Sequence, residues 1–155
     1  MKKMKQIMKD EEGLTLVELL AVVVIMAIIA GIAAVSISRV IQRTREDAQV
    51  SNVQQMLASA NLYDIQEEKG IPSTGITLDD LHKEGNIKSI AFAETEKITN
   101  IKFEKDTKGV ISVDLPEGAL TAGKEPNKAI KVSEEDSGSL NREKLFRIGS
   151  TTESK

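Results

Sequence analysis

The sequence contains no cysteine and no tryptophan, and only three Phe, one Tyr and one His among its 155 residues. Without cysteine the chain forms no disulfide, no zinc-thiolate site and no thiol nucleophile, and it is not lipidated at a cysteine. A single His excludes most histidine-based metal sites and catalytic triads. Aromatic residues make up 3% of the chain, so surfaces that stack on sugar rings or nucleobases are scarce. Any core must therefore be built from Ile, Val, Leu and Ala.

Charge is unevenly distributed along the chain. Charged residues account for 29% of the sequence and the net charge is -3, which argues against a surface that grips nucleic acid everywhere. From Leu19 to Ser38, however, twenty consecutive residues carry no charge. As a helix this run rises about 30 Å, the thickness of the hydrocarbon core of a bilayer. A core helix in so small a domain would not need that length, so the run predicts a single membrane span.

The residues before the span differ from an ordinary secretory signal. Residues 1–13 begin with basic side chains and end in three acidic residues followed by Gly13. Glu18 stands near the start of the apolar run, which is also long for a signal. The segment Ala34-Val35-Ser36 satisfies the small-x-small rule for signal cleavage, so this interpretation stays open. Four Lys precede the span and three Arg follow soon after it, so charge counting leaves the orientation undecided.

The basic leader that ends in Gly13, together with Leu14-Thr15-Leu16-Val17-Glu18 and the apolar run, resembles the start of a type IV prepilin. The resemblance covers the leader and the long helix, residues 5–65. It implies that a membrane aspartyl prepilin peptidase cuts between Gly13 and Leu14 on the cytoplasmic side. It also implies that the new terminal amine of Leu14 is methylated. Leu14 stands where the family usually has Phe, a departure that bears more on methylation than on cleavage.

The position of Glu18 has a physical consequence. An ionised carboxylate near the edge of the hydrocarbon layer costs on the order of 3 kcal/mol unless it is paired or reaches the headgroups. Cleavage after Gly13 creates an ammonium on Leu14, four residues before Glu18 and on the same helix face. We therefore predict that Glu18 pairs with this ammonium, within one chain or between an arriving subunit and a docked one, and serves assembly. The alternative is an interfacial charge that faces lipid headgroups.

One long helix is predicted over residues 14–69. After the span, the sequence up to Lys69 contains no Pro or Gly, and Gly70 and Pro72 then supply a cap and a stop. We expect the first half of this helix to pack among copies of itself and the second half to carry a globular domain.

The two halves of the helix differ in pattern. Residues 14–38 are apolar on every side, whereas residues 39–70 form an amphipathic half with one apolar stripe. The stripe consists of Val50, Val53, Met56, Leu57 and Ala60.

Residues 71–148 are predicted to form a small globular region, and residues 149–155 a disordered tail. A short helix capped by Thr77 and Asp80 and ended by Gly85 is expected first. An antiparallel sheet of three or four strands then packs on the apolar stripe, which gives an α+β fold of the type IV pilin kind. Its predicted strands are 98–104 and 110–115, joined by the turn 105–109, and then 129–132 and 144–148.

No catalytic, cofactor or metal site is predicted. His82 stands alone on the short polar helix, where an exposed side chain is expected, and the Ser and Thr residues lack a basic partner. The acidic loop 133–138 offers oxygen ligands for calcium but lacks the alternating spacing of an EF-hand loop, so we expect it to be solvated. Three basic residues follow the span, Arg39, Arg43 and Arg45, and acidic residues come directly after them. This pattern favours contact with the membrane surface or another subunit over nucleic acid.

The resemblance implies a structural subunit, a pilin or pseudopilin, rather than an enzyme. It would be inserted by a single span with a cytoplasmic amino terminus and later join a filament at the cell surface. The filament would serve as a surface pilus, in DNA uptake for competence, or in type II-like secretion. Expected partners are copies of the chain, prepilin peptidase, an assembly ATPase, a membrane platform protein and, before assembly, membrane lipid; DNA binding is not indicated. An uncleaved single-span anchor that displays residues 39–155 as a binding module remains the alternative.

Overall fold

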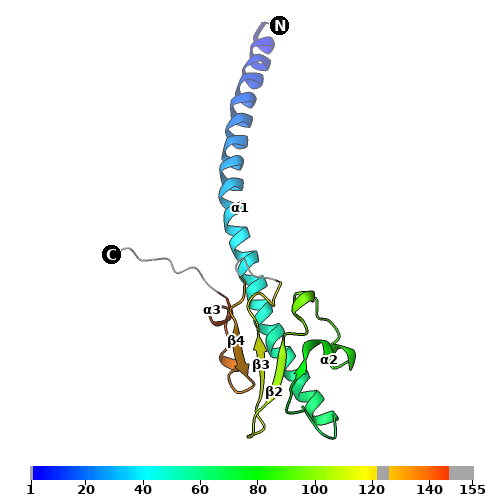
Figure 1. Cartoon of the computed structure of the whole chain (residues 1–155). Helices are drawn as coiled ribbons and strands as arrows, with labels where there is room; N and C mark the ends of the chain where they lie inside the picture. Colours follow the sequence, from blue (N-terminus) through cyan, green and yellow to red (C-terminus); the bar gives the residue numbers. More distant parts are fainter. Residues whose placement is uncertain (1, 122–125, 147–155) are drawn as a thin grey trace, which may run out of the picture. The chain divides into compact units, whose positions relative to one another are not determined.

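The structure is a computed structural model that describes residues 2–121 and 126–146, with side chains from Thr15 onward in those ranges. The chain divides into two units, Met1–Ile41 and Gln42–Lys155. Helix α1, Lys2–Gln66, runs through the first unit and supplies the opening helix of the second (Figure 1). The long N-terminal helix and the small antiparallel sheet confirm the predicted α+β fold.

Both ends of α1 differ from the predicted bounds. The helix begins at Lys2 rather than at residue 14 because the leader is rich in the helix formers Lys, Met, Gln and Glu. Its one glycine, which costs about 1 kcal/mol, does not interrupt the helix. It ends at Gln66 rather than at Lys69. Gly70 then adopts a φ of 61°, the left-handed conformation expected of a glycine after a helix.

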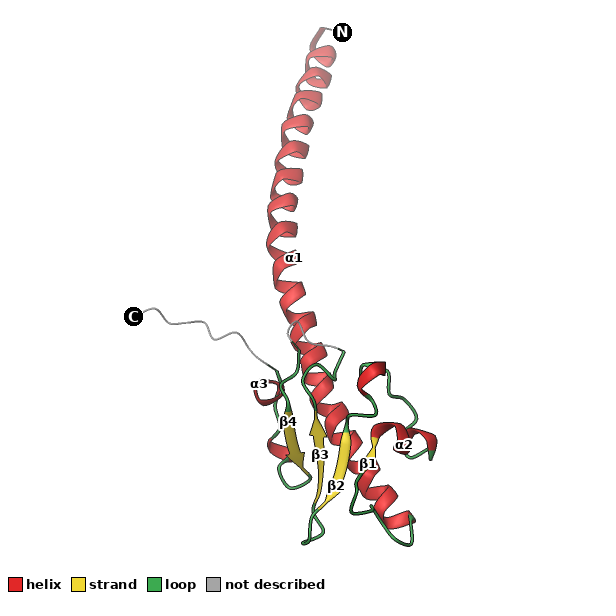
Figure 2. Ribbon diagram, in the orientation of Figure 1, coloured by secondary structure: helices red, strands yellow, loops and turns green. Residues whose placement is uncertain are grey.

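The amphipathic half of α1 forms one wall of the core in the second unit. Val53, Met56 and Ala60 have no exposed surface, Leu57 is 2% exposed, and Val50 packs at the edge. The apolar stripe predicted from the sequence is therefore confirmed as the core face of the helix. Figure 2 shows the strands lying alongside this half of α1.

The sheet has four antiparallel strands in the order β1-β2-β3-β4. Phe103 on β2 pairs with Val113 on β3, and Val113 pairs with Val132 on β4, which places three buried apolar side chains in one row. Ile111 and Leu115 share this inner face, as the alternation in the sequence predicts. The strands are β1 Ile76–Thr77, β2 Lys102–Lys105, β3 Ile111–Leu115 and β4 Ile130–Ser133.

The turn between β2 and β3 is fixed by one aspartate. The Oδ1 of Asp106 accepts hydrogen bonds from the backbone N–H groups of Lys108 and Val110, both at 2.8 Å. Gly109 has a φ of 90°, which a residue with a side chain rarely adopts. The hairpin predicted at this turn is confirmed.

The predicted short helix is also confirmed, as α2, Leu78–Lys83. The side chain of Thr77 accepts from the N–H of Asp80, and the Asp80 carboxylate accepts from the N–H of Thr77, which completes a capping box. Gly85, at a φ of 81°, lies just after this helix.

Two strand predictions are wrong. Residues 98–101 are not a strand, because the 3-10 turn η1, Thr95–Lys97, precedes them and the N–H of Ile101 donates to the carbonyl of Lys97. Residues 142–145 form the short helix α3, Arg142–Leu145, whose N-cap Asn141 accepts from the N–H of Lys144. The remaining residues of the predicted strand, apart from a single bridge at Phe146, lie outside the described part. The fourth strand of the sheet is instead β1, which is too short to show an alternating pattern.

Candidate functional site

The first unit presents a helix whose apolar side chains are exposed. Sixteen large apolar side chains between Leu16 and Ile41 are at least 47% exposed, and Leu16 reaches 75%. Covering one such side chain contributes about 1.5–3 kcal/mol, so covering them all is worth on the order of tens of kcal/mol. This surface is stable only when lipid or other protein covers it.

The part of α1 from Thr15 onward is long and apolar enough to cross a membrane, and its most apolar window is not buried within the structure. The predicted span is therefore present as a helix. A buried core helix would pass the same test of length and composition, but the exposure of this segment distinguishes it from one.

Glu18 is the one charged residue between Thr15 and Ser38. It is exposed, and together with Thr15, Leu19, Val22 and Val23 it lines a shallow surface of α1. Its four companions there are Thr15 and three apolar residues, and none of them carries a positive charge that would balance the carboxylate.

Gly13 and Leu14, the predicted cleavage pair, lie within α1. The peptide bond between them is therefore helical, and a protease that requires an extended substrate must unwind this turn locally. Glycine lowers the cost of such unwinding because it is among the weakest helix formers, at about 1 kcal/mol relative to Ala.

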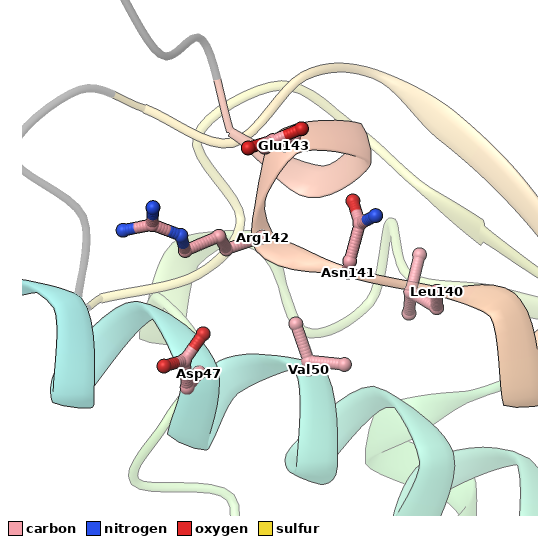
Figure 3. Close-up of a pocket in the computed structure, with 6 residues that line it drawn as sticks. All are labelled: Asp47, Val50, Leu140, Asn141, Arg142 and Glu143. Atoms are coloured by element: carbon pink, nitrogen blue, oxygen red, sulfur yellow. The ribbon is translucent and has the colours of Figure 1, made fainter.

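A groove lies between α1 and the segment that ends in α3, within the second unit (Figure 3). Its volume is about 320 Å³, and Val50 and Leu140 supply its apolar part. The Nη1 of Arg142 lies 4.0 Å from the Oε2 of Glu46, which helps to hold α3 near α1. The groove is lined by Asp47, Val50, Leu140, Asn141, Arg142 and Glu143. This lining contains no nucleophile paired with a base, so the groove offers no recognisable catalytic arrangement.

The acidic loop is held by bonds of its own. The Oγ of Ser133 donates to Asp136 and accepts from the N–H of the same residue, and Glu134 accepts from the side chain of Asn61 on α1. Within the described residues, no three His, Cys, Asp or Glu side chains gather as a metal site would require. His82 is exposed, as predicted, with its Nδ1 2.9 Å from the carbonyl of Ile87.

The shifted aspartate and glutamate groups of the described part belong to caps, turns and ion pairs. The hydroxyl of Thr77 lowers the pKa of Asp80, and the ammonium of Lys131 lowers the pKa of Glu104. These carboxyls have structural partners and are not poised for proton transfer.

Asn127 is a structural residue that the sequence analysis missed. Its side chain is fully buried, and its Oδ1 accepts from the N–H of Leu120 at 2.9 Å. Its Nδ2 donates to the carbonyls of Pro116 and Lys128. A buried Asn outside regular structure gives no periodic signal, so only the three-dimensional fold reveals this role.

The comparisons with known proteins bear on the amino-terminal region. Residues 8–34 match the family model of the prokaryotic N-terminal methylation motif. The chain carries the type IV pilin and pseudopilin signature. This signature spans Gly13, Leu14 and Glu18 and most of the exposed apolar helix, and it confirms the resemblance inferred from the leader. The comparisons with curated proteins and with solved structures gave no match.

The signature marks a family of structural subunits and implies, in general terms, processing by prepilin peptidase and assembly into a filament. Together with the exposed apolar helix, it fits anchoring in a membrane followed by pilus-like assembly at the surface. It covers residues 8–34, so the globular part of the chain lies outside the match.

Proposed function

We propose that this chain is a structural subunit, a pilin or pseudopilin, of a type IV pilus-like filament, and not an enzyme. The observation that supports this most is the coincidence of the methylation motif at residues 8–34 with an uncovered apolar helix. A signal peptide would be removed with its apolar segment. A subunit of this kind keeps the segment and covers it first with lipid and then with copies of itself.

In this proposal prepilin peptidase cuts between Gly13 and Leu14 on the cytoplasmic side, and the amine of Leu14 is methylated. Removal of residues 1–13 takes away Lys2, Lys3, Lys5 and Lys9, the basic residues that precede the span. The mature subunit then has an ammonium at Leu14 and a carboxylate at Glu18, one helical turn apart. These opposite charges lie together at the start of the apolar helix.

Transfer of the apolar helix from lipid to the filament gains little hydrophobic free energy, so another interaction must favour assembly, and Glu18 supplies it. Lipid tails are as apolar as the Leu and Ile side chains of neighbouring helices, so association must come from packing and polar pairing. Pairing between the Leu14 ammonium of an arriving subunit and Glu18 of a docked one provides such a term and fixes the axial register. An assembly ATPase and a membrane platform protein would supply the work of extraction.

The filament would serve as a surface pilus, in competence or in type II-like secretion. The test is to shear filaments from cells that make the wild-type chain and to detect the subunit in the sheared fraction. The proposal expects the subunit there in its shortened form. An uncleaved chain found only in membranes would instead support the anchored binding module.

A further inference from the structure

Three arginines follow the apolar run of α1 and have no acidic partner. Arg39, Arg43 and Arg45 are exposed, and none of them takes part in an ion pair or a side-chain hydrogen bond among residues 2–121 and 126–146. A guanidinium group keeps its charge at any physiological pH. We name these three residues the basic collar, because they place uncompensated positive charge at the end of the apolar helix.

The acidic residues that come next in the sequence are directed elsewhere. The Oε1 of Glu46 accepts from the Nε2 of Gln42 at 3.0 Å, and its Oε2 lies 4.0 Å from the Nη1 of Arg142. Asp47 lines the groove beside Arg142 (Figure 3). Acidic residues that follow a basic set can neutralise it by pairing one turn away. Here the fold turns Glu46 toward an arginine of another segment, so the collar stays available to an external anion.

The place of the collar in the chain sets its depth in a membrane. The uncharged run Leu19–Ser38 matches the hydrocarbon thickness of a bilayer, and the headgroup layer beyond it is about 5–7 Å thick on each side. At 1.5 Å per residue, Arg39 lies about 1.5 Å and Arg43 about 7 Å beyond Ser38 along the helix axis. Long basic side chains also extend toward the headgroups. Arg39 and Arg43 therefore fall in the layer that holds the lipid phosphates.

Arg39 and Arg43 also lie on one side of the helix. They are four residues apart, which brings their side chains together on the surface of α1. Arg45 is two residues further on and projects to a different side, at the outer margin of the headgroup layer. A planar guanidinium group matches the geometry of a phosphate with two parallel hydrogen bonds. The pair is suited to hold the phosphates of one or two neighbouring lipids.

The proposed orientation makes this charge unusual. Basic residues next to a span normally concentrate on the cytoplasmic side, whereas the proposed subunit carries the collar on the other side. Cleavage after Gly13 removes Lys2, Lys3, Lys5 and Lys9, and residues 14–38 contain no basic side chain. In the mature chain the collar thus supplies the basic side chains that flank the span.

The depth of the pair selects lipid over other anions. Carboxylates of another protein or the phosphates of DNA would also attract arginine. The layer that contains Arg39 and Arg43 is filled by headgroups whenever the apolar run spans a bilayer, so lipid phosphates surround the pair without any further encounter. Near a membrane, each basic residue favours an anionic surface by about fivefold, whereas a zwitterionic headgroup carries no net charge to attract it.

We propose that Arg39 and Arg43 bind the headgroups of anionic phospholipids in the leaflet opposite the leader. This inference rests on the membrane-held state of the proposed function and names the lipid class that accompanies the subunit there. The contact holds the span at a fixed depth, and it has to be released before the subunit leaves the membrane.

The test measures which lipids lie next to the protein. The full-length chain is reconstituted in phosphatidylcholine vesicles, and the restricted fractions of spin-labelled phosphatidylglycerol and spin-labelled phosphatidylcholine are compared. The test variant is Arg39→Gln/Arg43→Gln. The matched control, Lys69→Gln/Lys108→Gln, removes the same charge at two exposed positions outside α1 that belong to no ion pair in the described residues. We expect the preference for phosphatidylglycerol to fall at least about twofold in the test variant and to stay at the wild-type value in the control.

A conservative variant and added salt give a second reading. Arg39→Lys/Arg43→Lys keeps both positive charges and should retain most of the preference. Because salt screens charges at a membrane surface, the wild-type preference should also decline as the salt concentration rises. A preference that is equal in wild type and in the Gln variant at every salt concentration would overturn the lipid contact.

The remaining outcomes separate this inference from the proposed function. An equal loss in the test variant and in the control would overturn the contact, since net charge alone would then explain the preference. An unchanged preference combined with a loss of sheared filament from Arg39→Gln/Arg43→Gln would overturn it as well and would assign the arginines to another subunit. Both results leave the proposed filament intact. A wild-type chain that an alkaline wash removes from the vesicles has no span, which would overturn the proposed function and this inference together.

Discussion

The Nζ of Lys105 on β2 lies 2.6 Å from the Oδ2 of Asp64 in the last turn of α1. The other carboxylate oxygen of Asp64 accepts from the N–H of Ile71 at 2.8 Å. One side chain, 12% exposed, thus joins the end of the helix, the segment that leaves it and the hairpin. The hydrogen bond from Lys105 and the one from Ile71 lower the pKa of Asp64.

Two substitutions at Asp64 separate its roles. Asp64→Ala removes both interactions and leaves the N–H of Ile71 without its acceptor, so we expect a loss of about 1–3 kcal/mol in the free energy of unfolding. Asp64→Asn keeps an acceptor for Ile71 and removes only the ion pair, for which about 0–1 kcal/mol is expected. Denaturant unfolding of the full-length chain in detergent measures the loss of unfolding free energy in each variant. Equal losses in the two variants would contradict separate contributions from the Ile71 hydrogen bond and the ion pair.

Asp64 also predicts a pH dependence. Its pKa is lower in the folded chain than in the unfolded one, so its contribution is present above the unfolded value and is lost as the pH falls through the folded value. The stability difference between wild type and Asp64→Asn should therefore be full near neutral pH, start to fall near the ordinary aspartate pKa of about 3.9, and disappear only below the lowered pKa of the folded chain. A difference that persists unchanged at pH well below that value would rule out the ionised carboxylate as its source.

Asn127 is expected to be the most sensitive polar position of the core. Asn127→Ala leaves the N–H of Leu120 without its acceptor and removes one donor each from the carbonyls of Pro116 and Lys128, which costs about 1–3 kcal/mol. Asn127→Asp retains the acceptor but turns a carboxylate toward two carbonyls in a buried site, and we expect it to be more destabilising still. Thermal unfolding of the two variants and wild type provides the comparison. An Asp variant as stable as wild type would show that the site is open to water.

Processing should depend on the residue before the cut. Gly13→Val should leave an uncut precursor, because the peptidase must seat a residue without a bulky side chain there. In addition, valine favours the helical conformation more than glycine does, so local unwinding of α1 at the cut costs more free energy. Gln6→Val adds the same side chain elsewhere in the leader and should mature normally. Immunoblots of whole cells show the two sizes, and normal maturation of Gly13→Val would count against the proposed cleavage.

Glu18 should matter for assembly and not for insertion or cleavage. Glu18→Ala removes a costly charge from the membrane edge, so insertion should persist or improve, and the cut lies five residues upstream. Filament yield should nevertheless fall sharply, because the Leu14 ammonium of the arriving subunit loses its acidic partner. Glu18→Asp should restore assembly only in part, since its side chain is one methylene shorter. The ratio of sheared filament to membrane-held mature subunit measures this, and an unchanged ratio in Glu18→Ala would refute the pairing.

The sequence predicted those features that repeat or that follow a local rule. The stripe through Val53, Met56 and Ala60 was found from helical spacing, the hairpin from alternation around Gly109, and α2 from its capping residues. These signals depend on neighbours in the chain, which is why they can be recognised without the fold.

Features that depend on distant partners were missed. β1 consists of two residues held by pairing with β2. The helix α3 has a local cap in Asn141 and was missed for another reason, because the composition of residues 144–148 also suits a strand. The roles of Asp64 and Asn127 arise from contacts with residues 41 positions and up to 11 positions away, respectively. Of the candidate site, the motif around Gly13 and Glu18 was recognisable in sequence, whereas the groove beside α3 required the fold, because its lining comes from two distant segments of the chain.

The most direct test of the proposed function is the mass of the amino-terminal peptide of the protein recovered from whole cells, with any sheared filament included in the sample. The proposal predicts a peptide that begins at Leu14 and carries one methyl group on its terminal amine. A chain that begins at Met1 would show that the leader stays attached and would support the anchored module. A chain that begins at Ile37, directly after Ser36, would show that the apolar segment is a cleaved secretory signal and would contradict the filament altogether.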